Sequence, residues 1–278
     1  MLVYFLSMNK NPPIIYCVNI SEIITLFKII LYLIWSYFFL KYNMDALILA
    51  AGTGSRMGGI DSPKCLLNIG DTSIINYQIN CFKKLGIEKI FVLTGYNSEQ
   101  IKNHVNKDII LIPTSNYLTT NNLYSIWDAR SFLQNDFICV YGDLFFHKQI
   151  LSNCINNKND ICLVIEKNIR SETMRVKIEN DHIVEVNKTI PLKSSHGNFI
   201  GMSKFKKDVI PFFFNEVSKL IKIGNYDAYY TKAIESMIKN KQKIDYVETN
   251  NLPWLDIDEK HEYEEAKKIY KNMNMRYF

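Results

Sequence analysis

Short apolar runs alternate with segments of helical spacing between residues 46 and 141, and this alternation constrains the fold more than any other feature. Buried strands are expected at residues 46–51, 89–94, 109–112 and 137–141. Helices are expected between them, at residues 74–85, 98–105 and 122–133. Because such crossovers are right-handed, the pattern predicts an α/β fold of three α/β/α layers, Rossmann-like, around a mixed, mostly parallel sheet.

After residue 143 the pattern changes to short strands and tight turns. Strands are expected at residues 161–166, 174–178, 183–186 and 244–248, and the second and third of these form a β-hairpin. Helices are expected at residues 205–222, at residues 228–239 and from residue 259 onward. Since no Pro- or Ser-rich linker interrupts this half, residues 44–278 predict one domain with a small hairpin lobe.

Residues 1–43 form a hydrophobic extension with three possible interpretations. Residues 23–40 have about the length of a membrane-spanning helix, but Lys28 interrupts the apolar run and no cleavage site follows. The segment is a membrane anchor, or a peripheral or core helix, or it is untranslated because translation starts at Met44. Membrane contact is therefore expected only through residues 23–40, and the domain itself is expected in the cytoplasm.

Charge argues against a nucleic-acid site, and the cysteines and histidines argue against a zinc site. The formal net charge is +5, and two of these charges belong to residues 1–43, so the domain is too weakly basic to indicate a nucleic-acid partner. The six cysteines form no CxxC pair and lie mostly in apolar stretches, which is typical of reduced packing residues. Because the five histidines are scattered, no zinc site is expected.

A glycine-rich loop follows the strand at residues 46–51 directly. It reads LAAGTGSRM over residues 49–57, followed by SPK at residues 62–64. Gly52 and Gly54 let backbone N–H groups approach a triphosphate, and Arg56 and Lys64 can neutralise its charge. The loop lacks the GK[ST] end of a Walker loop. It also continues through further glycines where a dinucleotide-binding fingerprint would begin its helix.

This loop resembles the signature of the sugar-phosphate nucleotidyltransferase superfamily, which includes the MobA-like NTP transferase domains. The segments NNLYS at 121–125, YGD at 141–143 and WLDID at 254–258 look most like the phosphocholine and 2-aminoethylphosphonate cytidylyltransferase branch. The resemblance covers nearly the whole chain after Met44. It implies transfer of an NMP group, from CTP, onto a small phosphorylated acceptor such as phosphocholine or an aminoalkylphosphonate, with release of pyrophosphate and with Mg²⁺ as cofactor.

The resemblance also assigns residues to roles. Catalytic residues would be Arg56 and Lys64. The nucleotide would be bound by Leu49, Ala51, Gly52, Thr53, Gly54, Ser55, Arg56 and Lys64. Mg²⁺ would be held by Asp143 and Asp258, whereas Asp256 lies off the register usual in the family. An alternative role for Asp258 is the N-cap of the following helix.

The acceptor would be bound by Asn122, Lys188, Asp227, Tyr229 and Tyr230. An acid and aromatic faces suit a cationic head group, but tyrosines on an amphipathic helix can equally pack into a core, and Lys188 can be a surface lysine. Other functions stay open: a sugar-1-phosphate or molybdopterin nucleotidyltransferase, or a catalytically silent NTP-sensing regulatory subunit. Lys64 and the two metal acids together argue against the silent subunit.

Overall fold

The computed structural model describes residues 2–7, 14–19, 24–25, 27–29, 43–52, 62–114, 116–170 and 173–275. Contacts divide the chain into two units, Met1–Tyr42 and Asn43–Phe278. In the first unit, β1 (Leu2–Ser7) and β2 (Ile14–Asn19) pair antiparallel. Within the described residues, no helix is long and apolar enough to cross a membrane. Most of the predicted segment 23–40 lies outside the described residues, so the three interpretations of residues 1–43 stay predictions.

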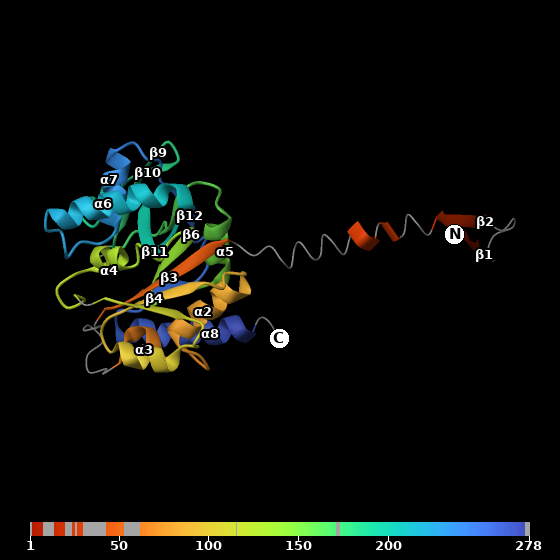
Figure 1. Ribbon diagram of the computed structural model, residues 1–278, viewed down its shortest axis with the longest axis horizontal. Coiled ribbons are helices and arrows are strands. Elements are labelled where there is room, and N and C mark those ends of the chain that lie inside the picture. The colour runs from red at the N-terminus through yellow and green to blue at the C-terminus, as the bar shows by residue number, and fades with distance from the viewer. Residues whose placement is uncertain are drawn as a thin grey trace. The chain divides into compact units, whose positions relative to one another are not determined.

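The second unit is built on a nine-stranded sheet (Figure 1). Its parallel part consists of β3 (Met44–Ala50), β4 (Ile90–Thr94), β5 (Ile110–Pro113) and β6 (Asp136–Tyr141). The antiparallel part consists of β8 (Ile161–Glu166), β9 (Arg175–Glu179), β10 (His182–Asn187) and β11 (Gly197–Phe205). β12 (Asp245–Glu248) runs parallel to β8. A separate ribbon pairs β7 (Leu144–Phe146) with β13 (Trp254–Asp256).

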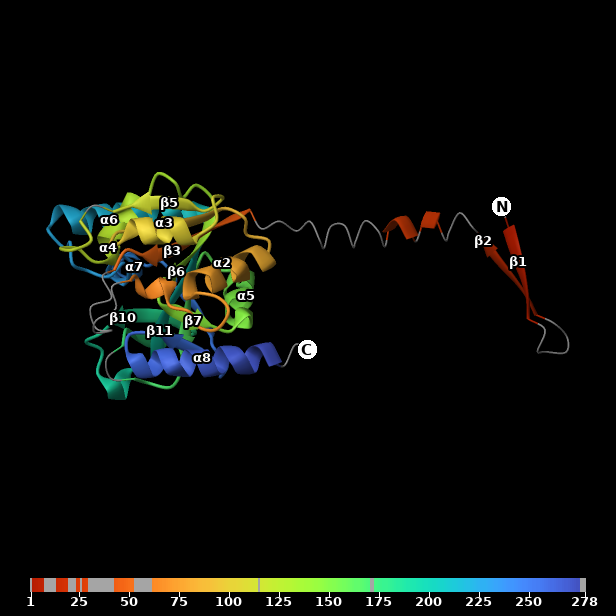
Figure 2. The ribbon, with the colours of Figure 1, turned by 90° about the horizontal axis from the view of Figure 1, so that it is seen from below.

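Helices cover both faces of this sheet, which confirms the predicted three-layer α/β fold (Figures 1 and 2). One side carries α4 (Asn122–Asp128), α6 (Ile210–Lys222) and α7 (Thr231–Lys239). The other helices are α2 (Ile74–Lys84), α3 (Ser98–His104), α5 (Lys148–Asn156) and α8 (Lys260–Met275). Short 3-10 turns are η2 (Lys64–Leu66), η3 (Leu192–Ser194) and η4 (Lys207–Val209).

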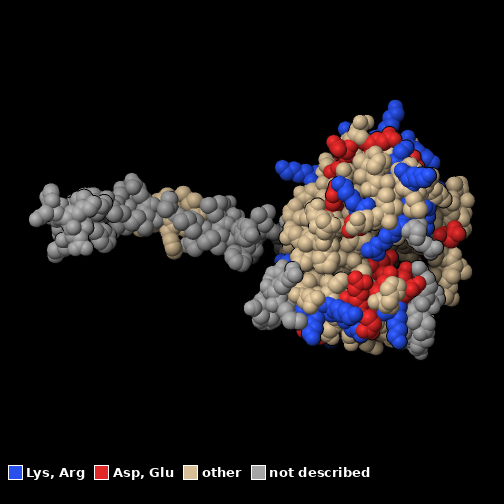
Figure 3. Space-filling model, turned by 180° about the vertical axis from the view of Figure 1, so that it is seen from behind, with Lys and Arg blue, Asp and Glu red and all other residues tan. Residues whose placement is uncertain are grey.

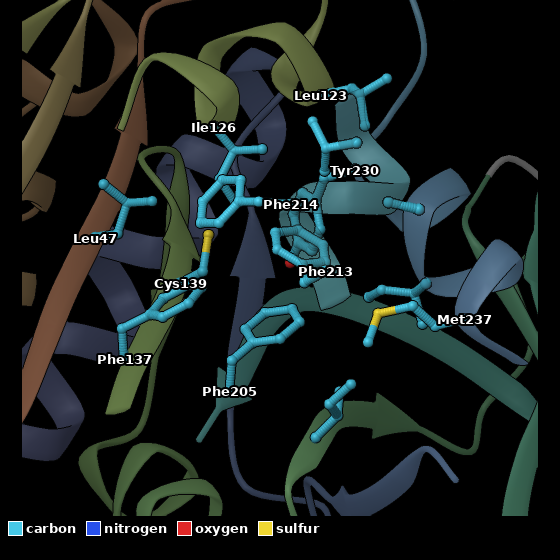
Figure 4. Close-up of a cluster of buried hydrophobic side chains, with 14 of the residues drawn as sticks. Leu47, Leu123, Ile126, Phe137, Cys139, Phe205, Phe213, Phe214, Tyr230 and Met237 are labelled. Carbon is cyan, nitrogen blue, oxygen red and sulfur yellow. The ribbon is translucent and has the colours of Figure 1, made fainter. Parts of the chain in front are cut away.

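The main hydrophobic core lies between the sheet and α4, α6 and α7 (Figure 4). Leu47 and Phe137 contribute from the parallel strands, and Phe205 contributes from β11. Phe137 and Phe205 stack with ring centres 4.8 Å apart, which joins the parallel and antiparallel halves of the sheet. Cys65, Cys81, Cys139, Cys154 and Cys162 are free and buried, as packing residues would be.

All the strands predicted from the sequence are present, but the structure also contains β11, which was not predicted. All nine of its residues are buried, yet the sequence analysis placed there only the start of a helix at residue 205. Its sequence, GNFIGMSKF, is broken by a glycine and polar residues, so no apolar run identifies it. β7 and β13 also escaped prediction, because strands of three residues carry too little periodicity. α5 was missed although Ile150, Leu151, Cys154 and Ile155 have helical spacing and are buried. The predicted helix 122–133 ends earlier, at Asp128.

Candidate active site

A groove of about 380 Å³ opens where the glycine-rich loop leaves β3. This is the edge at which open α/β sheets bind ligands, beyond the carboxyl ends of the parallel strands. On the face of the protein shown in Figure 3, acidic side chains gather in a hollow beside basic ones. The groove is lined by Leu49, Ala50, Ala51, Gly52, Pro63, Lys64, Cys65, Tyr117, Thr120, Asn121, Asn122, Ser125, Tyr141, Gly142, Asp143, Tyr229, Asp256 and Asp258.

The backbone after β6 places Asp143 in this groove. Gly142 donates its N–H to Leu49 O at 2.9 Å, so the turn lies directly against the end of β3. A Cβ atom at Gly142 would lie 2.9 Å from the same oxygen, closer than real contacts allow. Glycine at this position therefore lets the carboxylate that follows it approach the loop.

A second connection brings the C-terminal acids to the same point. β7 and β13 pair so that Leu144 lies opposite Asp256, and Ile257 donates its N–H to Asp143 O at 3.1 Å. Asp143, Asp256 and Asp258 can consequently each offer a ligand atom, all within 4.8 Å of one another. The structure brings together the two predicted metal acids and adds Asp256, which the sequence analysis ranked behind Asp258.

Asp256 has the most perturbed carboxyl group of the three. Burial, followed by the charges of Asp143 and Asp258, raises its pKa well above the ordinary value. Its Oδ1 atom is buried and has no hydrogen-bond partner among the described residues. A divalent cation between the three acids would relieve both the repulsion and the missing contact, and hard oxygen ligands of this kind suit Mg²⁺. The donor set therefore fits such an ion.

Lys64 reaches these acids from η2, immediately after the loop. Its ammonium group is ion-paired with Asp258 and lies 3.9 Å from Asp143 Oδ2. Glu262 accepts hydrogen bonds from the N–H groups of Asp258 and Glu259 at 2.7 and 2.8 Å, which stabilises the start of α8. Among the described residues that line the groove, Lys64 is the only lysine, and it lies beside the acids that the resemblance links to the metal.

The described part of the predicted nucleotide site lines the groove through Leu49, Ala51, Gly52 and Lys64. Thr53, Gly54, Ser55 and Arg56 lie outside the described residues, so their roles stay predictions. Tyr117 and Asn121 were not among the predicted ligand residues, although the NNLYS segment marked this stretch of the chain. Tyr141 also lines the groove, and burial raises its pKa well above the usual value.

Of the predicted acceptor residues, two lie in the described lining of the groove and three do not. Asn122 and Tyr229 line the groove, and Asn122 Oδ1 accepts the N–H of Tyr230 at 2.7 Å. Lys188 Nζ lies 3.2 Å from Tyr229 Oη and 4.6 Å from the ring centre. Asp227 is exposed and lies outside the described lining of the groove.

Tyr230 requires a correction. Its side chain is fully buried in the main core, and its hydroxyl group lies 2.8 Å from Ser203 Oγ (Figure 4). Tyr230 is therefore a packing residue: it immediately precedes α7 and its side chain enters the core, whereas the neighbouring Tyr229 lines the groove.

Comparisons with known proteins show which sequences and folds this chain resembles. Over 77% of this chain and 96% of the relative, it is 28% identical to a CTP:phosphoglutamine cytidylyltransferase of Campylobacter jejuni. Over 83% of this chain and 100% of the relative, it is 26% identical to a choline-phosphate cytidylyltransferase of Streptococcus pneumoniae. The solved CTP:phosphocholine cytidylyltransferase of S. pneumoniae superposes with a TM-score of 0.67 at 20% identity, covering 82% of this chain and 99% of that one.

The family comparison covers the loop, the parallel strands and the hairpin. Residues 46–186, just over half of the chain, match the model of the MobA-like NTP transferase domain. Gly52 at the start of the glycine-rich loop, Lys64 and Asp143 all lie inside this range, and all three line the groove. The protein therefore belongs to the family of MobA-like NTP transferase domains, as the glycine-rich loop predicted.

Proposed function

We propose that the protein is a Mg²⁺-dependent cytidylyltransferase. It transfers CMP from CTP onto a small zwitterionic phospho- or phosphono-amine, such as phosphocholine or an aminoalkylphosphonate, and releases pyrophosphate. The observation that carries this proposal is the convergence of Lys64, Asp143, Asp256 and Asp258 in one groove beside the end of β3. The cytidylyltransferases named above as relatives support CTP as the donor.

Asp143 and Asp258, joined by Asp256, would hold the magnesium ion. When bound, Mg²⁺ supplies positive charge that neutralises and aligns the triphosphate. Lys64 adds a second positive charge at the same edge, and Gly52 leaves the backbone open to the phosphates. Arg56 is expected to add a third positive charge.

The chemistry needs no covalent intermediate with the protein. An oxygen of the acceptor's phosphate or phosphonate attacks the α-phosphorus of CTP in line, and the bond from that phosphorus to the bridging oxygen of pyrophosphate breaks. Positioning and charge stabilisation are the main contributions a protein can make to such a transfer. The lining residues are suited to both contributions.

The acceptor would lie toward Tyr229. The ammonium group of Lys188, held against the Tyr229 ring, offers a positive charge to the acceptor's phosphate. The amine of the acceptor would then face the carboxylate of Asp227, which lies two residues before Tyr229 in the chain. Asn122 would fix the position of this segment, since it binds the backbone of Tyr230.

The test is pyrophosphate release from each of the four common NTPs with phosphocholine, phosphoglutamine, 2-aminoethylphosphonate and several sugar 1-phosphates. We expect the highest kcat/KM for CTP with a phospho- or phosphono-amine. Preference for a sugar 1-phosphate with UTP or GTP would contradict the acceptor and the base but leave the reaction class intact. NTP binding without turnover on any acceptor would instead favour the regulatory subunit.

A further inference from the structure

The turn that carries Asp143 is held by a side chain of α2. Gln78 donates through Nε2 to Tyr141 O at 2.9 Å and to Leu144 O at 2.7 Å. These two carbonyl groups bracket Gly142 and Asp143, the residues that leave β6 and enter the groove. Gln78 is fully buried, so both hydrogen bonds are shielded from water.

The chemistry of this contact requires a primary amide. Two carbonyl oxygens converge on one nitrogen, and an amide NH₂ group supplies the two donors that they need. The Oε1 atom of Gln78 is buried and has no hydrogen-bond partner among the described residues. Reversing the amide would place this oxygen against two carbonyl oxygens, so the observed orientation is fixed by the turn. Burying an unpaired oxygen is costly, and a native structure that retains one calls for an explanation.

The other backbone contacts of the turn show what the amide adds. Gly142 N–H is bound by Leu49 O, and Asp143 O accepts the N–H of Ile257. These bonds connect the turn to β3 and to the segment that carries Asp258. Gln78 connects it to α2, and the residue before it, Tyr77, donates its hydroxyl to Phe146 O at 2.7 Å in the strand that follows. α2 thus holds the backbone on both sides of Asp143.

We infer that Gln78 is a positioning residue for the metal-binding carboxylate of Asp143, an inference that rests on the proposed function. Gln78 does not line the described groove, so it acts through the backbone of the turn. Without its two donors, Tyr141 O and Leu144 O lose their fixed positions, and the Asp143 carboxylate moves relative to Asp256 and Asp258. Residues that orient metal ligands typically change metal affinity by about 10- to 100-fold when they are replaced.

The test compares Gln78→Met with Ile79→Val in the full chain. Methionine keeps the length of glutamine but donates no hydrogen bond, whereas Ile79→Val trims a buried neighbour on the same helix without touching the turn. Mn²⁺ binding is followed by electron paramagnetic resonance without nucleotide, and the melting temperature is measured for each protein. We expect Mn²⁺ to bind about tenfold more weakly to Gln78→Met and within about twofold of the parent to Ile79→Val.

A second variant and a second readout keep the test decisive. Gln78→Glu presents oxygens where the turn needs donors, and it should weaken Mn²⁺ binding as Gln78→Met does, even if one of the two proteins folds poorly. At a temperature where the melting curves show both Gln78 variants fully folded, excess Mg²⁺ should restore their kcat; because ligand binding itself stabilises a folded protein, the comparison is made only under that condition. Unchanged Mn²⁺ affinity in a folded variant would overturn the role of Gln78 alone. A parent protein that binds no Mn²⁺ would overturn the metal site itself.

Discussion

Glu166 illustrates how a single buried residue supports the active site. It accepts hydrogen bonds from Thr249 Oγ1 at 2.7 Å, Trp254 Nε1 at 3.1 Å and Asn168 N at 3.0 Å. Burial raises its pKa, but these hydrogen bonds outweigh burial, and the net pKa lies below the ordinary value of 4.5. Trp254 is the first residue of β13, which also contains Asp256. The ionised Glu166 therefore connects β8 to the strand that places Asp256 in the groove.

The lowered pKa predicts a pH effect for Glu166→Gln. Because the folded pKa is below the unfolded value, the parent gains stability from this group above about pH 4.5 and loses it as the pH falls through the folded pKa. The variant lacks this contribution. It should melt at a lower temperature at pH 7 and lose less stability than the parent on acidification from pH 5 to pH 3. Parallel acid profiles of parent and variant would contradict the prediction.

If Asp143 helps to bind Mg²⁺, as proposed above, Asp143→Ala should lose most of its activity. In the proposed function, removing this carboxylate removes a ligand of the ion that aligns the phosphates. Several kcal/mol of charge stabilisation correspond to a loss in kcat/KM of about a thousandfold or more. Asp108→Ala is a matched control, because Asp108 is exposed and paired only with Lys83 among its described contacts. Pyrophosphate release at several Mg²⁺ concentrations measures both. Near-parent turnover in Asp143→Ala would exclude the assigned metal site.

At the scale of elements, β11 connects the catalytic half of the sheet to the hairpin lobe. It pairs with β6 on one side and with β8 on the other, and its register with β8 shifts between Phe199 and Ser203. Gly201 lies within this irregularity with φ of +90°, a conformation that L side chains rarely adopt. A Cβ there would lie 2.6 Å from the ring of Tyr141, which lines the groove.

Gly201→Ala is therefore expected to be more destabilising than Gly224→Ala. Gly224 has a similar φ of +86° but open space around its Cβ position, so it reports backbone strain alone, about 1 kcal/mol. Gly201→Ala adds the clash with Tyr141 and should lower the free energy of unfolding by about 2 to 4 kcal/mol. Urea unfolding of both proteins measures the difference. Equal losses would show that the Tyr141 ring moves aside freely.

At the scale of the whole molecule, the described groove and the main core both belong to the second unit. Every lining residue and every core residue falls within Asn43–Phe278. A chain that lacks residues 1–42 would therefore retain every described residue of the groove and of the main core.

A chain that starts at Met44 should accordingly fold and retain at least about half of the kcat/KM of the full chain, since its core and groove are intact. Turnover and melting temperature of the two proteins in the same buffer measure this. Inactivity of the shorter chain, with the full chain active in detergent, would instead favour a working membrane anchor in residues 23–40.

The sequence by itself determined the parallel core of the fold and the location of the site. Apolar runs such as residues 46–51 are continuous and end at glycines, which is typical of strands buried on both faces. The glycine-rich loop needs its residue types for reasons that are local to the backbone. Asp143 was accessible to sequence reasoning because it follows a predicted strand at the edge where ligands bind.

Only the tertiary structure decided which side chains meet. Asp256 meets Asp143 and Asp258 through the register of β13 against β7. Tyr230 enters the core, whereas Tyr229 lines the groove. β11 is stabilised by pairing with β6, β8 and β9 rather than by its own pattern. Gln78 reaches carbonyl groups more than 60 residues away in the chain. Strand register and long-range hydrogen bonds depend on the packing of distant segments, and no local period in the sequence encodes that packing.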